Sequence, residues 1–81
     1  ITENAAILIA IGAAGEIYMD GRRIDVRQVK ANVIRLIAEN PQGSVVIQAD
    51  VKSTAEKIVA VMDEVREAGV VDISIASEPN F

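Results

Sequence analysis

The sequence predicts an α/β (α+β) two-layer sandwich, in which two helices cover one face of a mixed sheet. A chain of 81 residues has room for one domain, so we treat residues 1–81 as a single unit. Hydrophobic residues make up 51% of the chain but only 2% is aromatic, so Ile, Val, Leu, Met and Ala must build the core. Apolar spacings of 2 and 3.6 residues alternate along the chain and predict the order β-β-α-β-α-β.

Two strands open the predicted sheet. Residues 5–11 place an isoleucine at every second position, so the isoleucines share one side of an extended chain. Residues 16–20 alternate in the same way after a turn bracketed by Gly12 and Gly15. Asp20-Gly21 then favours a tight hairpin turn, because both residue types tolerate a positive φ. A short extended segment over 22–24 is expected to follow.

The first helix begins at Asp25. Asp25 and Gln28 have the spacing of a capping box, and Asn40-Pro41 ends the helical pattern. Arg35 and Glu39 are one turn apart and can form an ion pair. The expected core side of this helix consists of Val26, Val29, Val33, Leu36 and Ile37.

The second helix begins at Ser53, which has Glu56 in the capping-box position, and ends at Gly69. Its charged face is expected to be solvated. That face carries Lys57, Asp63, Glu64, Arg66 and Glu67. The expected buried stripe consists of Ala55, Ile58, Val59, Met62 and Val65.

Two more strands are predicted over residues 45–50 and 71–76. Right-handed strand-helix-strand connections place both helices on one face of the sheet. The strand side chains expected under the helices are Ile7, Ile9, Ile11, Ile17, Met19, Val45, Ile47, Val71, Ile73 and Ile75. The side chains left on the opposite face are Ala6, Leu8, Ala10, Tyr18, Val46, Gln48, Ser74 and Ala76. That face is either solvated or a contact surface, and the first and last strands are expected to leave open edges.

Composition excludes several classes of function. Twelve acidic against eight basic residues give a net charge of -4, the wrong sign for binding phosphates, so nucleic acid is not an expected partner. Without Cys or His the chain has no disulfide, thiolate, imidazole base or zinc site built on those ligands. Asp20, Asp25 and Asp50 have roles in turns and caps. We therefore expect no enzymatic activity, no cofactor and no metal.

The longest apolar and glycine run, residues 5–15, is 11 residues long, against about 20 needed to span a bilayer. We therefore expect a water-soluble domain. Two functional classes remain from the residues alone: a protein-interaction domain and a small-ligand-binding regulatory domain of the ACT type. The ACT order is β-α-β-β-α-β, whereas this chain starts with two strands, which favours the interaction domain.

Four segments carry a recognisable pattern: Gly15–Gly21, Val45–Asp50, Val61–Val70 and Ser77–Pro79. Together they resemble the periplasmic C-terminal domain of the ExbD/TolR family, the ExbD type more than the TolR type. The resemblance covers nearly the whole chain, and its most distinctive part is the helix-Ala-Gly-strand ending followed by Glu-Pro. One departure is Ala55, where the family often has an aromatic residue, commonly Tyr.

The resemblance implies a periplasmic domain of a single-pass bacterial inner-membrane protein that works in biopolymer transport, in the TonB or Tol system. A cytoplasmic tail and a transmembrane helix with a proton-handling Asp would precede Ile1. The implied partners are ExbB- or TolQ-like membrane subunits and a TonB- or TolA-like protein that receives the proton-motive force, with the full-length protein a homodimer. The residues that we expect to contact a partner are Leu8, Tyr18, Val46, Gln48 and Ser74.

Overall fold

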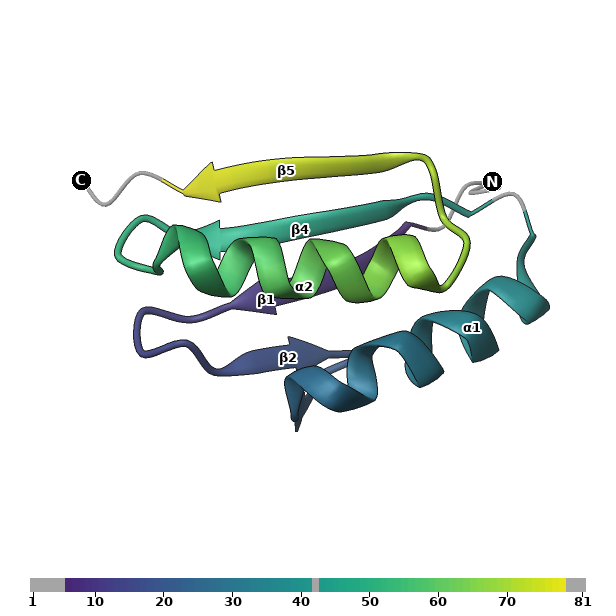
Figure 1. Cartoon of the computed structure of the whole chain (residues 1–81), viewed down its shortest axis with the longest axis horizontal. Coiled ribbons are helices and arrows are strands. Elements are labelled where there is room, and N and C mark those ends of the chain that lie inside the picture. Colours follow the sequence, from purple (N-terminus) through teal and green to yellow (C-terminus); the bar gives the residue numbers. More distant parts are fainter. Residues whose placement is uncertain (1–5, 42, 79–81) are drawn as a thin grey trace.

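The computed structural model describes residues 6–41 and 43–78, which form one sheet with two helices on the same face (Figure 1). A 3₁₀ turn, η1 (Val26–Gln28), leads into α1 (Val29–Glu39), and α2 (Ala55–Glu67) connects the last two strands. The predicted two-layer sandwich is confirmed. The strands are β1 (Ile7–Ile11), β2 (Ile17–Met19), β3 (Arg22–Ile24), β4 (Val45–Asp50) and β5 (Ile73–Glu78).

The strands lie in the order β3-β2-β1-β4-β5, which puts β1 at the centre of the sheet. β1 pairs antiparallel with β2 and parallel with β4, and β5 continues the sheet parallel to β4. The expectation that the first strand leaves an open edge is therefore wrong, and the edges of the described sheet are β3 and β5. The cause is α1, which carries the chain from β3 back to the other side of β1.

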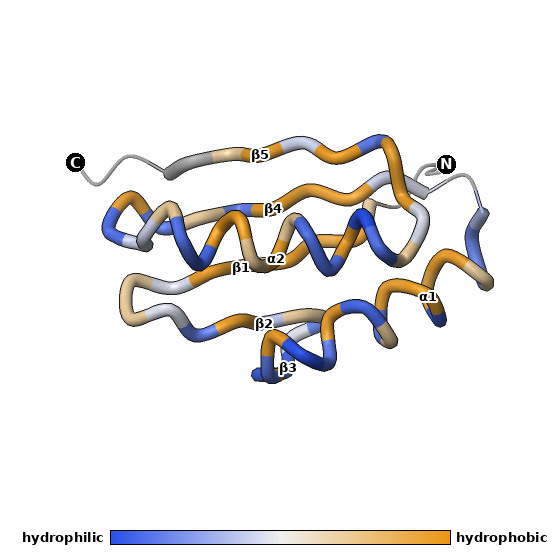
Figure 2. The backbone as a smooth tube through the Cα atoms, viewed as in Figure 1, coloured by the Kyte–Doolittle hydropathy of each residue, from blue (hydrophilic) through white to orange (hydrophobic). Residues whose placement is uncertain are grey.

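The core lies between the sheet and the helices and is aliphatic, as predicted. Figure 2 shows hydrophobic stretches along β1 and β4 and hydrophobic residues recurring on both helices. Removing one such side chain from water stabilises the fold by about 1.5–3 kcal/mol, so this layer supplies most of the favourable free energy. The buried members are Ile9, Ile11, Ile17, Met19, Val29, Val33, Val45, Ile47, Ala49, Val61, Val65 and Val70.

The edge strand β5 is less buried than the sequence predicts. It begins at Ile73 rather than Val71, which is 95% exposed, and Ile75 is 50% exposed. Both residues were expected in the core, and that expectation is wrong. α2 lies over the middle of the sheet, in front of β1 and β4, and leaves the outer strand partly uncovered (Figure 1). Val70, in the loop before β5, is buried instead.

The start and the buried stripe of α2 also differ from the prediction. Thr54, not Ser53, is the N-cap: its hydroxyl accepts the Lys57 N–H at 3.2 Å, whereas the Ser53 hydroxyl donates to the Asp50 carbonyl at 2.7 Å. Val61 is buried, because it lies three and four residues from the core-facing positions 58 and 65. The predicted Ala55 and Val59 are exposed.

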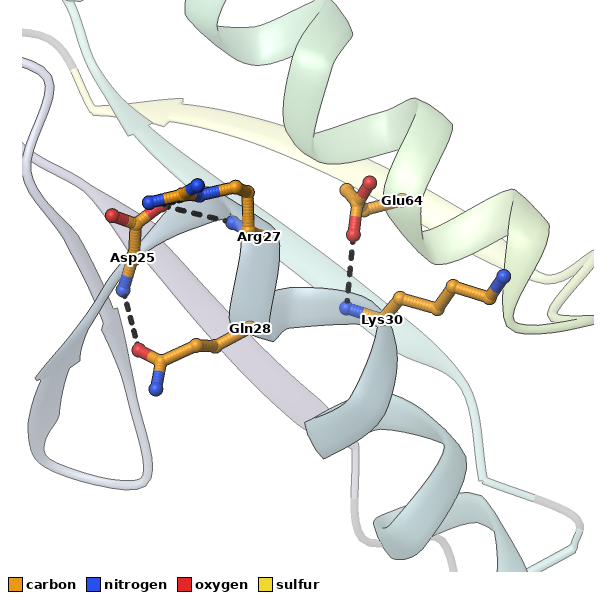
Figure 3. A network of polar contacts seen from close by, with 5 residues as sticks. All are labelled: Asp25, Arg27, Gln28, Lys30 and Glu64. Carbon is orange, nitrogen blue, oxygen red and sulfur yellow. Dashed lines mark hydrogen bonds and ion pairs between the residues drawn. The ribbon is translucent and has the colours of Figure 1, made fainter.

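Polar contacts fix η1, the 3₁₀ turn that leads into α1, and they confirm the predicted capping box at Asp25 (Figure 3). The α-helix itself begins four residues later, at Val29. The Asp25 carboxylate accepts the Arg27 N–H at 3.0 Å, and Gln28 Oε1 accepts the Asp25 N–H at 2.9 Å. The Lys30 N–H donates to Glu64 Oε1 on α2 at 3.3 Å, and the Lys30 ammonium lies 3.8 Å from a Glu67 oxygen. Part of the charged face of α2 therefore holds α1 in place, rather than being solvated only.

We expect neighbouring residues of β1 to differ sharply in their effect on stability. Ile9 is fully buried and Leu8 is 49% exposed on the other face. Ile9→Ala should lower the free energy of unfolding by about 2–5 kcal/mol, and Leu8→Ala by about 1 kcal/mol. Urea denaturation followed by circular dichroism measures both values. Equal losses would contradict the assignment of the two faces.

A second prediction concerns acid stability. The hydrogen bond from the Arg27 backbone, helped by the Arg27 charge, lowers the pKa of Asp25. A lowered folded pKa means that Asp25 stabilises the fold above the unfolded pKa of about 4, and that this contribution is lost as the pH falls through the folded pKa. Asn is also a good N-cap but does not titrate. The melting temperature of the wild type should therefore fall more steeply below pH 4 than that of Asp25→Asn, and parallel curves would refute the linkage.

Candidate functional site

The five residues predicted to contact a partner lie together on the sheet face that points away from the helices. Leu8 is paired with Val46, and Val46 with Ser74, in one row across the sheet. In the next row Ala10 stands between Tyr18 and Gln48. Residues in register on neighbouring strands project to the same side, so these side chains form a continuous surface. We call it the open face, consisting of Leu8, Ala10, Tyr18, Val46, Gln48, Ser74 and Ala76.

Solvent reaches most of the open face. Leu8 is 49% and Tyr18 38% exposed, Ser74 is exposed, and Val46 and Gln48 are half-buried. Neither α1 nor α2 lies on this side of the sheet (Figure 1). The surface is mildly apolar and carries the Tyr18 phenol, the Ser74 hydroxyl and the Gln48 amide. Arg23 of β3, which is in register with Tyr18, adds a positive charge at its edge. These groups suit contact with another polypeptide.

A groove of about 910 Å³ adjoins the open face beside the N-terminal half of β1. It runs between β1, the β2–β3 hairpin and the C-terminal end of α1. It includes the predicted Leu8 and Tyr18 and excludes Val46, Gln48 and Ser74. Its lining consists of Ala6, Ile7, Leu8, Ala10, Tyr18, Met19, Asp20, Gly21, Leu36, Glu39 and Asn40.

The groove exists because the hairpin turns away early. Asp20 and Gly21 have φ angles of 57° and 76°, the left-handed conformation that a tight hairpin requires, and the sequence predicts this turn. The β1–β2 ladder therefore ends at the pair Ile9 and Met19, while β1 continues beside β4 to Ile7. The share of α1 in the groove was missed from the sequence, because no local pattern shows where the end of a helix will lie across the sheet.

A smaller hollow of about 230 Å³ lies at the other end of β1, and Tyr18 borders both. It is lined by Ala10, Ile11, Gly12, Tyr18, Gln48, Ala49 and Asp50. Within residues 6–41 and 43–78, no three Asp or Glu side chains come close enough together to hold a metal ion. The helices of the described segments are all too short or too polar to cross a membrane.

Comparison with known proteins gives two matches. The family described as biopolymer transport protein ExbD/TolR matches residues 2–80. The biopolymer transport protein exbD2 of Vibrio cholerae serotype O1 is 42% identical over 76 residues, which cover 94% of this chain and 57% of that relative. The chain thus spans little more than half the length of this curated relative. The relative is of the ExbD type, the type that the sequence of this chain resembles more than the TolR type. These matches, which extend over nearly every residue, show that the chain belongs to the ExbD/TolR family.

Proposed function

We propose that this chain is the periplasmic interaction domain of an ExbD/TolR-type component of the inner membrane, which transmits proton-motive force to a TonB- or TolA-like protein. Family membership supports the setting, namely biopolymer transport by a membrane-anchored component. The observation that carries the role is the open face, a continuous, mildly apolar surface that the helices leave uncovered. The domain contributes contact in this proposal, and the proton-handling chemistry belongs to the membrane segment.

Transmission of force requires that the domain bind its partner more tightly in one state of the motor than in another. The open face provides side-chain contacts for that purpose, and a free sheet edge provides backbone hydrogen bonds. The two edges differ. β3 has three residues, of which Arg22 and Arg23 are charged, whereas β5 has six and is uncharged from Ile73 to Ala76. Charge on an edge strand discourages pairing, so β5 is the edge suited to a partner strand or to a second copy in a homodimer.

ExbB- or TolQ-like membrane subunits complete the proposed assembly. This part of the proposal is supported by the family match alone. The relative from Vibrio cholerae carries further sequence that this chain does not match, since the alignment covers 57% of it. The transmembrane helix and the contacts with those subunits belong to such sequence in the proposed full-length protein.

One observation favours the alternative of a small-ligand-binding regulatory domain of the ACT type. The groove of about 910 Å³ falls in the size range of ligand pockets, about 300–1,000 Å³. The strand order β3-β2-β1-β4-β5 arises from two hairpins before the first helix, which differs from the ACT element order. Calorimetric titration of the chain with amino acids separates the two candidate functions. Saturable binding supports the regulatory domain, and the absence of binding supports the interaction domain.

A titration tests the interaction directly. The isotopically labelled chain is mixed with a soluble periplasmic fragment of a TonB- or TolA-like protein, and amide shifts are followed by NMR. We expect the largest shifts at Leu8, Tyr18, Val46, Gln48 and Ser74, because a bound segment changes the environment of the open face. Shifts confined to the charged face of α2, at Lys57, Glu64 and Glu67, would reject the proposal.

A matched pair of variants controls for non-specific loss. Leu8→Thr removes apolar surface from the open face, and Val59→Thr removes it from an equally exposed position, 52% against 49%, on α2. We expect the first variant to weaken binding of the fragment by about threefold or more and the second to change it by less than twofold. Equal effects would show that the contact is not specific to the open face.

A further inference from the structure

We propose that the groove beside β1 is a binding site for a linear aliphatic diamine, a small organic cation with an amine at each end of an apolar chain. Three features of the groove lead to this class of ligand: two carboxylates without a cation, an apolar lining and a tyrosine ring. The groove shares Leu8 and Tyr18 with the open face. A bound diamine therefore competes with the partner protein, and this consequence rests on the proposed function.

The charge of the groove is negative. Asp20 lies on the hairpin and Glu39 at the end of α1, and no Lys or Arg is among the lining residues. Arg35, expected to pair with Glu39, donates instead to Asn32 Oδ1 at 2.9 Å, and within the described segments neither carboxylate is in an ion pair. The C-terminal end of α1 adds a partial negative charge. The groove therefore attracts a cation and repels an anion.

The lining favours an organic cation over a metal ion. Ions such as Mg²⁺ and Ca²⁺ take several oxygen ligands around one point, and no three Asp or Glu side chains within residues 6–41 and 43–78 come close enough together for that. Most of the remaining lining is apolar, and an alkyl chain laid against it leaves water, which stabilises the complex. The apolar lining residues are Ala6, Ile7, Leu8, Ala10, Met19 and Leu36.

Two amines suit the placement of the two carboxylates. Asp20 and Glu39 are both exposed and stand on separate elements that border the groove. An exposed ion pair contributes little by itself, so the complex needs both pairs together with the apolar contact. A ligand with an amine at each end meets both carboxylates, and its chain then lies against Ile7 and Leu36. The groove of about 910 Å³ has room for such a chain.

Tyr18 supplies the aromatic ring and is 38% exposed. Ammonium groups bind to the faces of aromatic rings, so Tyr18 offers a further contact for one amine. It is also the only tyrosine of a chain that has no Trp. The fluorescence of Tyr18 therefore reports directly on a ligand that enters the groove.

A ligand series tests the site. Octamethylenediamine is titrated into the isotopically labelled chain at low salt, with Tyr18 fluorescence as the measure of binding and NMR amide shifts as the map. We expect half-saturation at about 1 mM, the affinity that two exposed ion pairs and one alkyl chain support. The largest shifts should occur at Leu8, Gly21 and Glu39. No change in fluorescence, or shifts spread evenly over the acidic surface, would overturn the proposal.

Two further ligands separate the charge from the apolar contact. Trimethylenediamine keeps both amines but has a shorter chain, and it should bind at least about fivefold more weakly because it removes less apolar surface from water. The zwitterion ω-aminooctanoate keeps the chain but replaces one amine by a carboxylate, and it should bind at least about tenfold more weakly because Asp20 or Glu39 repels it. Equal affinity of either ligand and octamethylenediamine would contradict the site.

Variants of the carboxylates test the residues. Asp20→Asn keeps a residue type that tolerates positive φ, and Glu39→Gln keeps the shape of the side chain. The double variant should bind octamethylenediamine about tenfold more weakly, in line with the loss of two partly exposed ion pairs. Asp63→Asn with Asp72→Asn makes the same change of net charge at exposed positions outside the groove, and should alter affinity by less than twofold. Equal losses in both double variants would show a general charge effect and contradict the site.

Competition tests the consequence for the proposed function. Octamethylenediamine at about five times its half-saturating concentration should weaken binding of the TonB- or TolA-like fragment about fivefold, because the two exclude each other by mass action. It should have little effect on the double variant of Asp20 and Glu39. Unchanged affinity of the fragment for the wild type would contradict the competition. If the fragment shifts the open face while the diamine leaves Tyr18 fluorescence unchanged, this inference fails and the proposed function stands. If the diamine binds and the fragment does not, the proposed function fails and the ligand site stands.

Discussion

The alternation of side chains along β1 and β4 is the constraint on which the rest of the structure depends. Ile9 and Ile47 are in register and fully buried under the helices, so Leu8 and Val46, one position earlier, must point to the other side. A slip of one residue would exchange the two faces and expose the core. Burial of one side of these strands therefore determines which residues lie on the other side. Because both helices cover the same face of the sheet, the apolar residues of the opposite face stay in contact with solvent.

The second determinant is the length of β2. Three residues separate the glycine-containing turn from the Asp20-Gly21 hairpin, so β2 pairs with only part of β1. The same turn creates β3, which places two arginines at one edge of the sheet, whereas β5, the other edge, is uncharged from Ile73 to Ala76. The hairpin therefore determines which edge of the sheet carries two arginines and which part of β1 has no pairing with β2. The C-terminal end of α1 lies beside the part of β1 that β2 does not reach, and it forms the second wall of the groove.

The sequence was sufficient for the parts that depend on local chemistry. The hairpin at Asp20-Gly21, the cap at Asp25 and the parity of Leu8, Tyr18 and Val46 all follow from residue type and spacing. It was insufficient where packing decides between equivalent choices. Val59 and Val61 both suit a helical stripe, Ser53 and Thr54 are both good caps, and Ile75 alternates correctly although half of its surface is exposed. The groove depends on where the end of α1 lies relative to β1, which is set by tertiary contacts alone.

Thiol labelling tests most directly whether the open face is bare in the isolated chain and covered in the working assembly, because the chain has no cysteine of its own. Ser74→Cys places a thiol on that face, and Val45→Cys places one at a fully buried position of the adjacent strand. With a membrane-impermeant maleimide, the first should react rapidly in the purified chain and slowly in the full-length protein inside its assembly, while the second should be slow in both. A Ser74→Cys thiol that reacts equally fast in the assembly, or is already protected in the purified chain, would contradict the account.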